Sequence, residues 1–129
     1  MAEPVAPLDA ELVAVTALKA GLTARSDTAK VGTKVPNPRP LRMCRVSLVD
    51  SPQRTHIHFG AVLLVECWDT TELAAGQLAR RAYGILSALA DTDPVVDVNE
   101  VGGIANFPDP DVGPRYQFTL ELTLRGELV

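Results

Sequence analysis

The side chains with the clearest potential for metal chemistry are His56 and His58, which begin an expected long strand ending at Trp68. Residues two apart on a strand point to the same face, so the two imidazoles have the arrangement of paired metal ligands. A third ligand would have to come from an acid such as Glu66 or Asp50, and no spacing in the sequence places one beside them. The pair therefore favours histidines at a surface or interface, with a metal site as the alternative.

Two other groups of reactive residue types are better explained by structure than by chemistry. Cys44 and Cys67 are the only cysteines, and each lies among apolar residues of an expected strand. This setting is typical of reduced core thiols, although a disulfide between neighbouring strands is geometrically possible. Asp91, Asp93 and Asp97 lack the glycine and the terminal glutamate of an EF-hand calcium loop. They indicate a helix end that turns through Asp-Thr-Asp-Pro.

Motifs for catalysis are missing from the sequence. It contains no glycine-rich phosphate loop, no G-x-S-x-G elbow, no C-x-x-C and no H-E-x-x-H. We therefore predict a protein that is not an enzyme and that uses no metal or cofactor. The sequence instead favours a protein whose role is to assemble with other subunits.

Hydrophobic periodicity predicts two helices that position these residues. Asp9 has the place of an N-cap for a first helix over residues 9–22, where apolar residues recur at helical spacing. Thr70 or Thr71 caps a second helix that ends near Leu89. Its apolar stripe consists of Leu78, Ala82, Ile85, Leu86 and Leu89.

Alternating and apolar runs predict the strands. They cover residues 41–49, 57–68, 95–101 and 116–125, with a short edge strand near 29–35. A bulge at Gly102-Gly103 lets the third of the longer strands continue to Phe107. Residues 1–7 are expected to form a loose lead-in, and residues 23–40 a basic, proline-rich loop.

The element order is then α-β-β-β-α-β-β in a single domain over residues 1–129. Two helices pack on one face of a mixed or antiparallel sheet, which is an α+β fold. The strand ending at Trp68 is apolar on both faces, so it is central or covered by another subunit. Some 13 residues at about 3.3 Å each reach about 43 Å, against a diameter of roughly 36 Å for a globule of this length. The strand must bend, for example at Gly60, or project.

Composition and charge narrow the class of protein. Hydrophobic residues make up 47% and charged residues 22%, and the net charge is −4, which argues against dedicated nucleic-acid binding. No apolar run reaches the roughly 20 residues that span a bilayer. The first residues lack the basic start and apolar core of a signal peptide, so we expect a cytoplasmic protein.

Charge is distributed unevenly along the chain. Residues 25–54 hold seven basic residues and two acids, whereas residues 91–111 hold six acids and no lysine or arginine. One interpretation is an ordinary solvated surface. The other is that the two regions meet across a subunit boundary, where complementary charge steers and orients the contact.

Two further features are candidates for such a boundary. Trp68, the sole tryptophan, is expected at the corner between sheet and helix and can serve as an interface anchor. Arg80 and Arg81 lie on the outer side of the second helix, and with Arg42 and Arg45 they are candidates for a subunit contact.

These elements together resemble a known family. The sequence has a leading helix, a basic proline-rich loop, the strand Pro-Leu-Arg-Met-Cys-Arg-Val-Ser-Leu-Val and a long strand ending in Glu-Cys-Trp-Asp. A helix follows that begins Thr-Thr-Glu-Leu-Ala-Ala and contains Ala-Arg-Arg-Ala-Tyr. Over roughly residues 8–126 this layout resembles the tail terminator proteins of long-tailed bacteriophages, most of all those of phages infecting actinobacteria. The alanine-rich, acidic composition of the chain also suits such hosts.

The resemblance implies a structural protein of the virion, assembled in the host cytoplasm. It implies a homohexameric ring at the head-proximal end of the tail that stops growth of the tail tube and joins the head-tail connector protein. The genome passes through such a ring without sequence-specific contacts. In this family a long β-hairpin and charged loops mediate subunit contacts, which map here to residues 41–68 and 30–39. The short turn Asp50–Arg54 departs from this pattern, because it leaves little hairpin to project.

The residues predicted to lie at a subunit or tube interface are Lys30, Lys34, Arg39, Arg42, Arg45, His56, His58, Trp68, Arg80, Arg81, Asp97 and Glu100. Three alternatives stay open at this point. The chain is another head-tail connector or neck subunit, a small metal-binding domain that uses His56 and His58, or a monomeric ligand-binding α+β domain.

Overall fold

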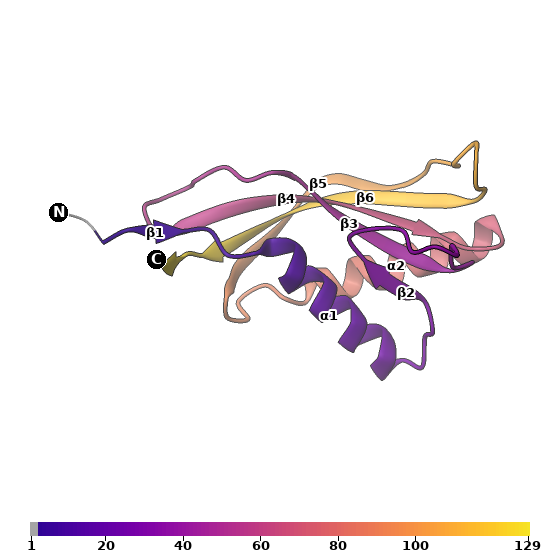
Figure 1. The fold of residues 1–129 in the computed structure, drawn as a ribbon, viewed down its shortest axis with the longest axis horizontal. Helices are drawn as coiled ribbons and strands as arrows, with labels where there is room; N and C mark the ends of the chain where they lie inside the picture. The colour runs from indigo at the N-terminus through magenta and orange to yellow at the C-terminus, as the bar shows by residue number, and fades with distance from the viewer. Residues whose placement is uncertain (1–2) are drawn as a thin grey trace.

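The computed structural model describes residues 3–129 and contains two helices on a five-stranded sheet (Figure 1). The elements in chain order are β1 (Val5–Ala6), α1 (Ala10–Ala24), β2 (Lys30–Gly32), β3 (Met43–Asp50), β4 (His58–Trp68), α2 (Glu72–Ser87), β5 (Val95–Asn106), β6 (Arg115–Arg125) and β7 (Glu127–Leu128). The expected α+β class is confirmed. The expected order omitted the short strands β1 and β7.

The main sheet has the strand order β2-β3-β4-β6-β5. β2 runs parallel to β3, and the other neighbours are antiparallel. β4 pairs with β6 over its whole length, from His58 opposite Arg125 to Trp68 opposite Arg115. Its central place explains why its residues are apolar on both faces. Of the two alternatives for this strand, a bend or a projection, projection of β4 alone is excluded, because β6 accompanies it from end to end.

Both helices cover the same face of the sheet (Figure 1). The hydrophobic core lies between the helices and this face. The fully buried large side chains on this face include Leu18, Leu22, Leu63, Leu78, Leu86, Phe118, Leu120, Leu122 and Leu124. Burying one such leucine contributes about 1.5–3 kcal/mol. A Cβ on Gly21 of α1 would come within 2.7 Å of Ile85 on α2, so this glycine lets the two helices approach closely.

The helix caps and the bulge appear where the sequence predicts them. The backbone N–H of Leu12 donates to Asp9 at 3.0 Å, and that of Ala74 donates to Thr71 at 3.1 Å. The first helix runs to Ala24, two residues beyond the expected end. The pairing of β5 with β6 shifts register on both sides of Gly102, which confirms the bulge.

The ends of the chain are more ordered than expected. Val5 pairs with Leu128 and Ala6 with Glu127 in a two-stranded antiparallel sheet, so the expected loose lead-in is wrong from Val5 onward. Met1 and Ala2, also part of that expectation, lie outside the described residues. A Cβ on Gly126 would meet Val5 at 2.5 Å and Phe59 at 2.6 Å, so this position accepts only glycine without a shift of its neighbours.

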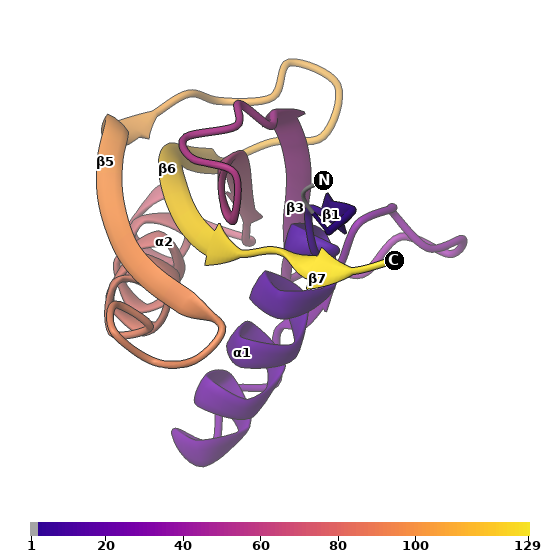
Figure 2. The same ribbon diagram turned by 90° about the vertical axis from the view of Figure 1, so that its left-hand side faces the viewer.

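The second face of the sheet, here called the outer face, is covered by loops instead of helices. The segment between β3 and β4, residues 51–57, folds back over the sheet, with the N–H of Gly60 donating to the carbonyl of Pro52 at 2.7 Å. At the other end the proline loop (residues 33–42) and the acidic loop (residues 107–114) meet around Trp68. Figure 2 shows the proline loop projecting on the side opposite β5. No helix among residues 3–129 is long and apolar enough to span a membrane.

Candidate functional site

Arg42 forms ion pairs with two acids of its own chain. Its guanidinium contacts Asp27 at 2.8 Å and Asp69 at 2.7 Å, and both carboxylate side chains are almost fully buried. Arg81 of α2 also binds Asp27, at 2.9 Å. Burial opposes ionisation of Asp27, but hydrogen bonds from Arg42, Ala29 and Arg81 outweigh it and lower the pKa of Asp27. These contacts hold the segment after α1 against β3 and α2.

The hydrogen bonds to Asp27 and then to Asp69 raise the pKa of Arg42 above its ordinary value. The sequence predicts Arg42 as an interface residue from its place in the basic region and Arg81 from its place on the outer side of the second helix. The structure brings both of them to one buried acid instead, so their positive charge is used within the chain.

A second internal network lies on the outer face around Glu66. This acid is 5% exposed and accepts hydrogen bonds from Arg45 at 3.1 Å and Arg115 at 3.0 Å. The two arginines come from β3 and β6, which flank β4 on either side. Each charge has a partner on a neighbouring strand, which is what makes a buried carboxylate tolerable.

Trp68 lies on the same face as Glu66, beneath two guanidinium groups. The expected position at the sheet-helix corner is wrong, because the side chain points away from the helices and is 4% exposed. Arg39 of the proline loop lies 4.6 Å from the ring centroid, and Arg115 lies at 5.8 Å. The indole N–H donates to Asp109 of the acidic loop at 3.2 Å. Trp68 therefore fastens both loops to the sheet.

The pKa of Asp109 is lowered in this arrangement. The backbone N–H of Asp111 contributes most to lowering it, and the Trp68 indole, Arg115 and Arg39 add to the effect. Beside the cluster is a cavity of about 500 Å³ lined by Arg39, Pro40, Leu41, Trp68, Asp69, Thr70, Asp111, Val112 and Pro114. The Nε and Nη2 atoms of Arg39 are buried and have no hydrogen-bond partner within residues 3–129.

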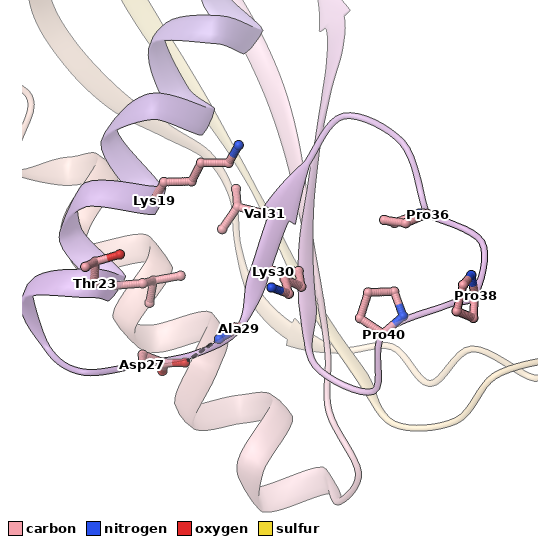
Figure 3. A pocket seen from close by; sticks show the side chains of 10 residues that line it. Lys19, Thr23, Asp27, Ala29, Lys30, Val31, Pro36, Pro38 and Pro40 are labelled. Carbon is pink, nitrogen blue, oxygen red and sulfur yellow. Dashed lines mark hydrogen bonds between the residues drawn. The ribbon is translucent and has the colours of Figure 1, made fainter.

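A second cavity of about 550 Å³ lies between the end of α1, β2 and the proline loop. Figure 3 shows Lys19 and Lys30 on one side of it and Pro36, Pro38 and Pro40 on the other. Lys30 and Lys34 are exposed and have no ion-pair partner in the part of the chain that the structure describes. The β2 side of the sheet is therefore a basic edge, defined here by Lys30 and Lys34, whereas Arg39 of the proline loop lies over Trp68 of the central strand β4.

The opposite side of the sheet is an acidic edge. β5 is the terminal strand of the sheet, and Asp97 and Glu100 on it are exposed. The Tyr83 hydroxyl donates to Glu100 Oε2 at 2.6 Å, and this bond raises the pKa of Tyr83. Asp97 accepts from its own neighbours, Val98 and Asn99.

The two histidines do not share a strand face. His56 lies in the turn before β4 and contacts the Glu3 carbonyl at 3.1 Å through Nε2, whereas His58 is the first residue of β4. The expected same-face arrangement is wrong because the strand begins at His58, two residues after His56. Residues 3–129 contain no group of three His, Cys, Asp or Glu side chains placed to hold a metal ion.

The two cysteines are buried free thiols, as predicted. Cys44 and Cys67 lie directly opposite each other on β3 and β4, with their sulfur atoms 3.5 Å apart. The hydrogen bond to Cys44 and the burial of the site raise the pKa of Cys67 well above its ordinary value. A thiol in this state is a poor nucleophile at neutral pH.

Arg80 is exposed on α2 and has no ion-pair partner within the described part of the chain. The acids that neutralise Arg42, Arg45 and Arg81 were not identified from the sequence. One signal was available: Glu66 interrupts the apolar run of β4, where an unpaired carboxylate would be costly. No family model matches this chain, and no curated protein matches it significantly.

Proposed function

We propose that this chain is a structural protein of a long-tailed bacteriophage. In this proposal it forms a homohexameric ring on the head-proximal end of the tail tube. The ring ends tube polymerisation and offers the surface that the head-tail connector joins. The layout of the sequence suggests the class, and the charge of the two sheet edges supports assembly into a ring.

The observation that carries the proposal is the separation of unpaired charge onto opposite edges of one sheet. Arg42, Arg45 and Arg81 are neutralised inside the chain. Of the basic residues without an ion-pair partner, Lys30 and Lys34 lie at the β2 side and Arg80 lies on α2, while exposed acids lie on β5 at the other end of the strand order. Two different, complementary surfaces on opposite sides of one subunit suit a head-to-tail contact, which closes into a ring when the rotation allows it.

The shapes of the two edge strands favour subunit contacts made by side chains over direct pairing of strands between copies. β5 is long, but its register is broken at three points, and bulges and charges on an edge strand oppose direct strand addition. On the other side, β2 has only three residues and is followed by the projecting proline loop. In the proposed ring the acidic edge of one copy therefore meets the basic edge and proline loop of the next.

The first test is the solution mass of the purified protein by light scattering, measured across concentration and salt. We expect the mass of six subunits at low salt and dissociation as salt rises, because exposed charges beyond about 8–10 Å are screened at physiological ionic strength. The variant Lys30→Glu/Lys34→Glu is expected to dissociate at lower salt than the wild type. Arg80→Glu, which reverses the charge of an exposed residue on α2, is the control for a charge reversal outside the basic edge.

The second test addresses the partner. Purified protein is mixed with the tail tube protein of the same phage during tube growth, and the products are measured by electron microscopy. We expect rings at one end of each tube and shorter tubes at higher ring concentration. Binding to the head-tail connector without any effect on the tube would identify another neck subunit and overturn the terminator role.

A further inference from the structure

Arg39 has hydrogen-bonding capacity that the single chain does not use. Its Nε and Nη2 atoms are buried without a partner among the described residues, although buried donors are nearly always satisfied because an unmade bond costs free energy. These two atoms form one edge of the guanidinium. That edge matches the two oxygens of a carboxylate, which it binds in a bidentate, planar fashion.

The setting of Arg39 is that of an interface anchor. Its guanidinium lies on the Trp68 ring at 4.6 Å, so its position is restricted before any partner arrives. Leu41 is 77% exposed and Val112 is 47% exposed, and both line the cavity beside the guanidinium. An arginine and a tryptophan surrounded by apolar side chains are the residue types that dominate binding energy at protein interfaces.

The acidic edge holds the best complement to this site. Glu100 is exposed, and its Oε2 atom is fixed by Tyr83 while Oε1 accepts no hydrogen bond within residues 3–129. The adjacent Val101 is 58% exposed, so the carboxylate has an apolar neighbour as Arg39 has. Asp97 is less suited, because both of its oxygens already accept local hydrogen bonds. Arg39 and Glu100 lie on opposite sides of the sheet, so the contact requires two copies.

We propose that the Arg39 guanidinium of one copy binds the Glu100 carboxylate of the next copy. This inference rests on the proposed ring and names the residue pair that joins its subunits. The unsatisfied atoms are shielded in the single chain, so the guanidinium turns toward the cavity on binding.

Two charge-reversed variants test the pair. Arg39→Glu places two acids in every head-to-tail contact, and Glu100→Arg places two arginines there. Each variant alone is expected to associate at least tenfold more weakly than the wild type by light scattering. An equimolar mixture is expected to recover wild-type assembly, because copies of the two variants that alternate around the ring bring one acid and one arginine together at every contact.

Folding and assembly are separated by controls. Thermal unfolding of each variant establishes that it is folded, and Arg39→Gln gives a neutral variant that is expected to weaken association without repulsion. The double variant Glu100→Arg/Arg80→Glu is the matched negative control: it adds an acid on α2 instead of at position 39, and it is expected to recover nothing.

The outcomes distinguish this inference from the proposed function. If the wild type forms rings and the mixture of folded variants does not recover them, the residue pair is wrong and the ring stands. If either folded variant assembles as well as the wild type, the pair is also wrong. A wild type that forms no oligomer alone or on the tail tube overturns the proposed function and this inference with it.

Discussion

The two faces of the sheet are stabilised in different ways. The helix-covered face is closed by apolar side chains from α1, α2 and alternate residues of the strands. The outer face is closed by loops, which are attached through Arg39, Arg54 and Arg115 to aromatic rings and carboxylates. The first face depends mainly on apolar burial, with the ion pairs of Asp27 at its margin, whereas the second depends on individual polar partners.

This difference indicates which face of the sheet can bind another molecule without first losing contacts within the chain. Apolar packing is non-directional, and its loss on exposure opposes any rearrangement of the helix-covered face. A guanidinium on an aromatic ring can gain a carboxylate without loss of the ring contact. The outer face therefore contains both the loop attachments and the one site among residues 3–129, at Arg39, where a buried donor pair lacks a partner.

The largest expected effect is on the helix-covered face. Leu122→Asp puts a charge at a fully buried position among apolar side chains, so we expect loss of the cooperative fold, a cost of more than about 4 kcal/mol. Circular dichroism and thermal unfolding measure this. Thr119→Asp, on the half-buried outer face of the same strand, is the control and is expected to remain folded. Similar unfolding of both variants would contradict the contrast between the faces.

Removal of Arg42 is expected to have the next largest effect. Arg42→Gln leaves Asp27 and Asp69 buried with fewer partners, and loss of one partner of a buried ion pair costs roughly 3 kcal/mol. Urea unfolding of Arg42→Gln and of Arg80→Gln tests this, since Arg80 is exposed and its replacement should change stability by less than about 0.5 kcal/mol. Equal stabilities would show that the Arg42 pairs contribute little.

The contribution of Asp27 is expected to depend on pH. Its pKa is lower in the folded state than its ordinary value of about 4. The stability from this shift is therefore fully present above the unfolded pKa and is lost as pH falls through the folded pKa. The stability difference between wild type and Asp27→Asn should be constant near pH 7 and shrink below about pH 4. A difference that is unchanged in acid would show that Asp27 does not act through its charge.

The helix-covered face was largely predictable from the sequence, and the outer face was not. Alternation in the last strand predicts its buried residues, since Phe118, Leu120, Leu122 and Leu124 all lie in the core. Periodicity reports which side of an element is apolar, so it also identified the stripe of α2. The boundaries of the elements were predicted less accurately: α1 ends at Ala24 instead of residue 22, and His56 lies before β4 instead of on it. Local sequence signals at turns are weaker than the periodicity within elements.

The polar networks on both sides of the sheet depend on contacts between residues far apart in the chain. Arg42 was assigned to an interface because its neighbours in sequence are basic, yet it lies beside Asp27 and Asp69 in the fold. Local charge density carries no information on such pairing. The same limit applies to Trp68, whose place in the sequence gave no indication that the proline and acidic loops converge on it.

The smallest of the expected effects concerns this convergence. Trp68→Phe keeps an aromatic ring under Arg39 but removes the indole N–H that binds Asp109, and the smaller ring attracts a cation less strongly. We expect a loss of about 1–2 kcal/mol in unfolding free energy. Phe107→Leu is the control, because Phe107 also lies near Arg115 but is 55% exposed. If Trp68→Phe is no more destabilising than Phe107→Leu, the acidic loop is held by Arg115 and Glu66 and not by the tryptophan.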